Sequence, residues 1–156
     1  MRVVFLLAMF FTASVQAATP SFEYDTYYNA RFGFKVSYPS ELFVPTGESD
    51  NGDGQHFVER RGRALIIASG GHNLEPDIMC NLEQALLWED DLNVTYRRQI
   101  GDSAFFSGTK GSNIIYRKLV RTDTVCLNLT LQYPIEDKAF YDDIVTKVVK
   151  SFTPIK

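Results

Sequence analysis

Apolar and polar residues alternate along several short segments of the chain, which is the pattern of strands that bury one face. The clearest is 124–133, in which every second residue from Val125 to Leu131 is apolar. A second, 32–38, ends at Pro39, which suits the end of a strand. Further strands are predicted at 55–60, 64–69, 93–100, 104–109 and 113–122.

Two other segments repeat their apolar residues at helical spacing. The first is 73–89, where Asn73 can cap the helix, Pro76 fits its first turn and Trp88 is expected to pack under the sheet. The second is 137–152, whose apolar residues share one face. Short connections between the strands favour antiparallel pairing. The predicted fold is therefore α+β, with a single antiparallel sheet of about six strands and two helices on one face or on both.

The start of the chain has the pattern of a secretory signal peptide over residues 1–17. A basic Arg2 precedes an apolar run, and small residues lead up to Ala17. The run is shorter than the roughly 20 residues that span a membrane, and no second apolar segment of that length follows. We therefore expect a periplasmic or secreted protein, with an N-terminal arm or short edge strand at 18–29 and one domain at 30–156.

Composition and charge narrow the class of protein. The 156 residues are 45% hydrophobic and 22% charged, which excludes disordered and fibrous chains. The formal net charge is −3, and removal of Arg2 with the leader makes it more negative. An acidic chain without a basic tract argues against a nucleic-acid partner.

Cys80 and Cys126 are the only two cysteines of the sequence, and both lie in the part expected to be exported. An even number in an oxidising compartment favours a disulfide between them, which would join a predicted helix to a predicted strand. Two separate buried thiols are the alternative, since cysteine is among the residues most often buried.

One segment carries a family resemblance. Gly33-Phe34-Lys35-Val36-Ser37-Tyr38-Pro39, together with the order of helices and strands, resembles the PsbP-like family. That resemblance implies an α-β-α sandwich and a non-enzymatic accessory function, because members in plants and cyanobacteria are lumenal accessory proteins of photosystem II. Related bacterial folds are small secreted or lipid-anchored proteins, so the resemblance supplies a fold rather than a site.

Few residues suggest chemistry. Asp50, Asn51 and Asp53 lie in a turn-rich loop that could gather oxygens around a cation, although Arg60 stands where a calcium loop needs a bidentate Glu. The two histidines, His56 and His72, are too few for a zinc site. No nucleophile motif is present. We therefore expect no catalytic residue, no metal centre and no cofactor. A solvated turn is the alternative to cation binding at the acidic loop.

A partner-binding surface is predicted from two groups of residues. Tyr24, Tyr27 and Tyr28 crowd the start of the mature chain, and aromatic residues are favoured at interface cores. Arg97, Arg117 and Arg121 fall on predicted strands and could form a positive stripe that meets an anionic partner. Outward strand residues that keep the sheet soluble are the alternative for the arginines, and an edge strand folded onto the domain is the alternative for the tyrosines.

These features predict an exported, non-catalytic binding or accessory protein of the bacterial cell envelope, whose partner is a protein or another envelope component. A periplasmic immunity protein that neutralises an envelope-targeted toxin is the first alternative, since an acidic surface would suit a basic active site. A small hydrolase is the second, and it would need a cleft with a nucleophile.

Overall fold

The structure is a computed structural model, and it describes residues 21–74 and 80–155. The predicted signal peptide at 1–17 lies outside the described residues. So do residues 75–79, which include Pro76 and belong to the first half of the segment predicted to form the first helix.

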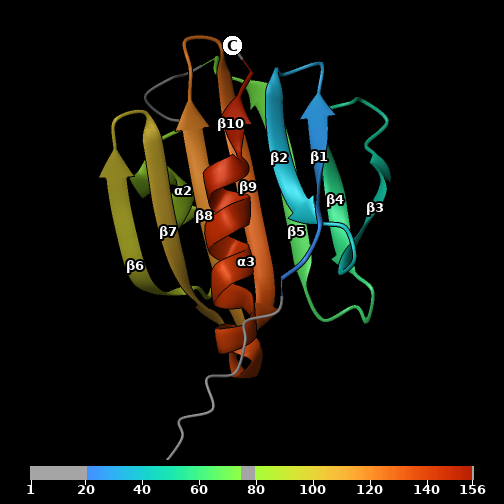
Figure 1. Cartoon of the computed structure of the whole chain (residues 1–156). Coiled ribbons are helices and arrows are strands. Elements are labelled where there is room, and N and C mark those ends of the chain that lie inside the picture. Colours follow the sequence, from blue (N-terminus) through green and yellow to red (C-terminus); the bar gives the residue numbers. More distant parts are fainter. Residues whose placement is uncertain (1–20, 75–79, 156) are drawn as a thin grey trace, which may run out of the picture.

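The described chain forms two antiparallel sheets (Figure 1). The larger has seven strands in the order β3-β4-β5-β9-β8-β7-β6. The smaller has three, in the order β1-β2-β10. The strands of the larger sheet are β3 (Phe43–Glu48), β4 (Gly54–Glu59), β5 (Leu65–His72), β6 (Asn93–Ile100), β7 (Ser103–Lys110), β8 (Asn113–Arg121) and β9 (Val125–Pro134). Those of the smaller are β1 (Tyr24–Asn29), β2 (Phe34–Pro39) and β10 (Thr153–Pro154).

The prediction of a single sheet of about six strands is therefore wrong, although the α+β class is right. The smaller sheet was missed because the two strands beside the predicted β2 carry little periodicity: β1 has three tyrosines among six residues, and β10 has two residues. Both become strands only because they pair with β2, from opposite ends of the chain. Of the two expectations for the N-terminal segment, an arm or a short edge strand, β1 is the edge strand.

The larger sheet is covered differently on its two faces (Figure 1). The long helix α3 (Lys138–Ser151) and the small sheet lie side by side on one face, which we call the front. The short helix α2 (Leu82–Leu87) lies on the back. A helix on each face was one of the two predicted arrangements. No described helix has the length and apolarity needed to cross a membrane.

The alternation of β9 directs this layering. Val125, Leu127, Leu129 and Leu131 belong to the core between the large sheet and the front layer. Cys126 belongs instead to the smaller core under α2. Successive side chains of a strand point to opposite faces, so one central strand contributes to both cores.

Helix α3 presents the apolar face that its spacing predicts. Tyr141, Ile144, Val145 and Val148 are buried on the helix, and Phe152 is fully buried just after it. Phe152 contacts the ring of Phe34 on β2 edge to face. The helix therefore packs against both sheets.

Helix α2 is shorter than predicted in its described part, and its cap is a different residue. The Asn81 side chain accepts hydrogen bonds from the N–H groups of Glu83 and Gln84, whereas the Asn73 side chain donates to the Thr122 carbonyl. Trp88 is 60% exposed, so the expectation that it packs under the sheet is wrong. A helix this short has room to bury only its inner residues, such as Ala85.

A buried carboxylate closes the hairpin between β4 and β5. Glu59 is 1% exposed, and it accepts hydrogen bonds from the Arg61 and Arg63 N–H groups and from the Arg61 side chain. Burial by itself would raise the pKa of Glu59, but these hydrogen bonds and the Arg61 charge outweigh it and hold the pKa below its ordinary value. The carboxylate thus stabilises the turn in its charged form.

We predict that Glu59→Gln lowers the free energy of unfolding by about 2 kcal/mol at pH 7, because the turn loses charge-assisted hydrogen bonds. Since the folded pKa lies below the unfolded one, this stabilisation is present above the unfolded pKa and is lost as the pH falls through the folded pKa. Urea unfolding at pH 7 and at pH 3 measures both effects. A gap between variant and wild type that stays constant across this range would contradict the prediction.

Candidate functional site

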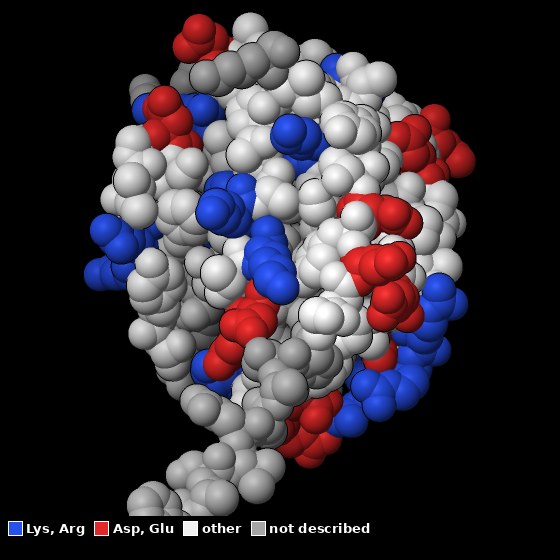
Figure 2. Space-filling model, viewed as in Figure 1, with Lys and Arg blue, Asp and Glu red and all other residues white. Residues whose placement is uncertain are grey.

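Three lysines without an ion pair in the described part of the chain lie on the front, where α3 meets the small sheet. Lys147 and Lys150 project from α3, and Lys35 projects from β2, around one hollow of about 480 Å³. Figure 2 shows basic side chains gathered over this part of the front. Four hydroxyl-bearing residues also line it: Thr26, Ser37, Ser151 and Thr153.

Local structure explains how these side chains come together. Lys147 and Lys150 are three residues apart on a helix, so they share a face. Lys35 pairs with Thr153 across β2 and β10, and the Ser151 hydroxyl accepts a hydrogen bond from the Ser37 N–H. The end of α3 is therefore fastened beside β2, although the two are far apart in the sequence.

The three ammonium groups have no ion pair within the described residues. Lys147 lies over the ring of Tyr24 at 5.5 Å, a cation–π contact that leaves most of its charge unneutralised. Three like charges around one hollow repel each other unless an anion joins them. On a protein of net charge −3, this arrangement favours an anionic ligand or an anionic protein surface.

A second hollow runs along the other side of α3, over β7 and β8. Two adjoining depressions of about 480 and 410 Å³ share Tyr116, Val145 and Thr146 in their walls. Burial raises the pKa of Tyr116, and nearby Tyr96 raises it further, so its phenol stays neutral. This groove is mostly apolar, and Lys150 stands on the ridge between it and the lysine-lined hollow.

Lys118 forms part of the groove, but its ammonium group is bonded to the backbone of α3 and the residue after it. Its ammonium donates to the carbonyls of Val149 and Phe152 at 2.9 and 2.7 Å, where α3 ends. A cation suits the negative end of a helix, so this lysine fixes the helix to β8. Burial lowers its pKa.

The predicted tyrosines do not form one exposed surface. Tyr28 is 61% exposed and lines the lysine-lined hollow. The ring of Tyr24 makes the cation–π contact with the Lys147 ammonium. Tyr27 points the other way, between Phe34 and Phe57, and its hydroxyl donates to Glu48 at 2.6 Å. Burial, followed by the bond to Glu48, raises the pKa of Tyr27 to about 12.

The predicted arginines lie on the back of the sheet, each beside a carboxylate. Arg97 is 3.6 Å from Glu83, Arg121 is 3.5 Å from Asp102, and Arg117 forms an ion pair with Glu89. They therefore share no surface with the tyrosines on the front. Their role in binding a partner stays a prediction, but as paired charges they offer less to an anion than the three lysines do.

The acidic loop folds around its own side chains. The Asp53 carboxylate accepts hydrogen bonds from Ser49 and, at 3.0 Å, from the Asn51 amide, and these bonds lower its pKa. The Arg31 guanidinium donates to the Asn51 carbonyl. Where the structure describes the chain, no three His, Cys, Asp or Glu side chains converge to hold a metal. Cation binding by Asp50, Asn51 and Asp53 stays a prediction, and this bonding favours the alternative of a solvated turn.

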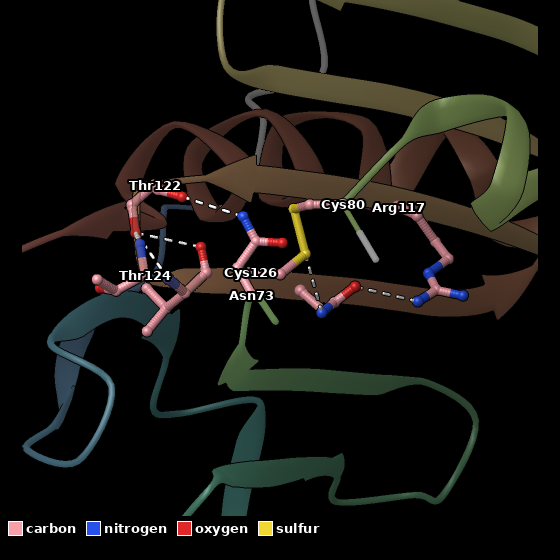
Figure 3. The surroundings of a disulfide bond; sticks show 8 residues. Asn73, Cys80, Arg117, Thr122, Thr124 and Cys126 are labelled. Carbon is pink, nitrogen blue, oxygen red and sulfur yellow. Dashed lines mark hydrogen bonds between the residues drawn. A yellow bond between two sulfur atoms is a disulfide. The ribbon is translucent and has the colours of Figure 1, made fainter. Parts of the chain in front are cut away.

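The predicted disulfide is present in the structure (Figure 3). It joins Cys126 of β9 to Cys80, which lies just before α2 rather than within a helix, and the two Cα atoms are 5.5 Å apart. The ion pair between Arg117 and Glu89, which lies two residues after α2, holds the segment that follows this helix against β8. Together these two contacts attach a short helix that buries few side chains of its own.

Sequence reasoning missed the lysine-lined hollow. Lys147 and Lys150 suggested only a favourable helix end, and Lys35 is an ordinary outward residue of a strand. Their convergence depends on the pairing of β2 with β10 at the end of α3. No sequence signal marks these charges as unpaired, because Asp143 stands four residues before Lys147, the spacing of a helical ion pair.

The comparisons with known proteins agree on the fold. The chain matches the solution structure of cyanobacterial PsbP (CyanoP) from Synechocystis sp. PCC 6803 with a TM-score of 0.59 and 9% identity, covering 92% of this chain and 96% of that one. It also matches a crystal structure from Bacteroides thetaiotaomicron VPI-5482 with a TM-score of 0.53 and 13% identity, covering 79% of this chain and 45% of that one. No protein-family profile and no curated protein matches the sequence. The chain therefore has a PsbP-like fold.

We predict that replacing both cysteines by alanine lowers the free energy of unfolding by about 4 kcal/mol, the loop-entropy value for a bridge that closes 46 residues. Thermal unfolding with and without a reductant measures this, and the reductant should leave the double variant unchanged. Thiol labelling of the oxidised, denatured wild type should find no free cysteine; a labelled thiol would contradict the bridge.

Proposed function

We propose that the protein is an exported, non-catalytic binding or accessory protein, and that its front face docks an anionic surface of another envelope component. The observation that carries the proposal is the convergence of Lys35, Lys147 and Lys150 on one hollow, where none of them forms an ion pair with a described carboxylate. The hydroxyl groups beside them already bond within the protein: Ser151 donates to the Val148 carbonyl, and Thr26 bonds with Ser37. The ammonium groups therefore supply the attraction for carboxylates or phosphates.

Several features support an exported accessory role. A disulfide suits an oxidising compartment, and the leader predicted at 1–17 would direct the chain there. The PsbP-like fold is shared with the cyanobacterial PsbP named above. Cys80 is bonded to Cys126, which leaves it unable to serve as the nucleophile of a hydrolase.

The choice between partners follows from charge. An immunity protein that blocks a basic active site needs a cluster of carboxylates at its docking surface. Asp142, the nearest acidic residue of α3 in the adjoining groove, is already paired with Lys138 at 2.8 Å. Asp143 near Tyr24 also has no ion pair in the described part of the chain, but the three lysines outnumber it around the hollow, so an anionic partner is the better match.

We predict that the triple variant Lys35→Gln, Lys147→Gln, Lys150→Gln binds poly-L-glutamate about tenfold more weakly than the wild type at low salt, because rim charges govern electrostatic association. Isothermal titration at two salt concentrations measures the loss, and the wild-type affinity should fall as salt rises.

The matched control is Lys110→Gln, Lys138→Gln, Arg60→Gln, which changes the net charge by the same amount at sites away from the hollow. This control should bind within about twofold of the wild type. Both variants are then used as bait in a pull-down from envelope extract, where a stoichiometric partner should be lost with the first variant and kept with the control. Equal losses in both variants would contradict a defined docking site.

A further inference from the structure

The strand β6 ends the large sheet with an edge that no other described strand covers. It is the last in the order of the seven-stranded sheet, and all eight of its residues are exposed. In Figure 1 it lies at the far side of the sheet from the small sheet, beyond both α3 and β7. An edge strand presents a row of backbone N–H and C=O groups that can pair with another chain.

The turn after β6 determines which backbone groups face outward. Residues 101–102 form a two-residue loop between Ile100 and Ser103, and Gly101 has a φ of +54° as a tight hairpin turn requires. The pair that flanks such a loop is hydrogen-bonded across the two strands. By alternation, the backbone groups of Arg97 and Gln99 point away from β7, toward the open edge.

The other edge of the sheet is protected, whereas β6 is not. Strand β3 contains Pro45 and a bulge between Pro45 and Glu48, and Glu48 also accepts a hydrogen bond from Tyr27. Proline and bulges are the devices that prevent pairing at an edge. β6 contains no proline, and its one irregularity lies between Val94 and Tyr96, which leaves 96–100 regular.

The side chains of β6 give this edge a chemical preference. Arg97 and Arg98 are neighbours at its centre and point to opposite faces of the sheet. Arg97 has the weak ion pair with exposed Glu83, and Arg98 has no ion pair in the described part of the chain. Tyr96 and Ile100, 42% and 51% exposed, flank the two charges.

We propose that the open edge of β6 binds an extended segment of a partner protein, which adds a strand to the sheet and places two adjacent acidic residues opposite Arg97 and Arg98. The proposal rests on the proposed binding function in that the partner is an anionic protein, but it uses residues away from the lysine-lined hollow. Backbone pairing supplies affinity, and the charges on both faces of the added strand supply specificity.

Charge also argues against a second copy of this chain at the same edge. An antiparallel pair of β6 strands centred on Arg97 places that residue opposite its own copy, and one centred on Arg98 does the same for Arg98. Like charges directly opposite each other destabilise a sheet. A foreign segment with carboxylates in those positions meets no such penalty.

The test uses a labelled eight-residue peptide of alternating Thr and Val with two adjacent Glu at its centre. Fluorescence anisotropy with the oxidised protein measures its affinity, and NMR of the protein amides locates the site. We expect the amide signals of β6 and β7 to shift. The Glu peptide should bind about tenfold more tightly than the same peptide with two Lys in place of the two Glu. N-methylation of alternate residues along one peptide edge should abolish binding, while methylation along the other edge should preserve it, because only one edge pairs.

Variants of the protein separate this site from the lysine-lined hollow. The double variant Arg97→Gln, Arg98→Gln should bind the Glu peptide about tenfold more weakly than the wild type. The variant Arg97→Pro should not bind it, because proline removes an outward N–H. Thermal unfolding checks that both variants fold. The triple lysine variant should bind the peptide as the wild type does, so the two proposals fail independently.

Three results would overturn the inference. The first is the absence of binding, and the second is binding that ignores N-methylation or moves the amides of α3 instead. The third is a dimer in analytical ultracentrifugation that Arg97→Pro dissociates, since the edge would then serve self-association.

Discussion

The need to cover both faces of the seven-stranded sheet governs the rest of the structure. Seven strands about 4.8 Å apart make a layer roughly 30 Å wide, whereas one helix about 10 Å across beside a three-stranded sheet about 10 Å wide covers about 20 Å. The front layer therefore reaches β8 and leaves β6 and β7 open. The apolar groove beside α3 and the unprotected edge of β6 are both consequences of this shortfall.

The back of the large sheet must also be covered, and the only described helix there is short. Helix α2 has six residues, too few to be stable through burial alone. The disulfide to β9 and the ion pair from Glu89 to Arg117 fasten it over β7, β8 and β9. Covalent attachment thus replaces apolar area in this layer.

The front layer also creates the lysine-lined hollow. Its walls are the end of α3 and the outer face of β2, which β10 fastens together immediately after the helix. Lys118 fixes the same helix end from beneath through two carbonyl groups. A rigid frame of this kind lets three exposed ammonium groups hold a common orientation, and that arrangement suits recognition of an anion better than chemistry on it.

The sequence by itself determined the α+β class, the strands from β4 to β9 and the apolar face of α3, because local periodicity decides each of them. It favoured the disulfide through the number of cysteines, and one short motif carried the PsbP-like resemblance. Only the tertiary structure decided the second sheet, the exposure of Trp88, the separation of Arg97, Arg117 and Arg121 from the tyrosines, and the convergence of Lys35 with Lys147 and Lys150. These depend on which distant segments pair and on which face each strand turns outward, and no local pattern encodes either.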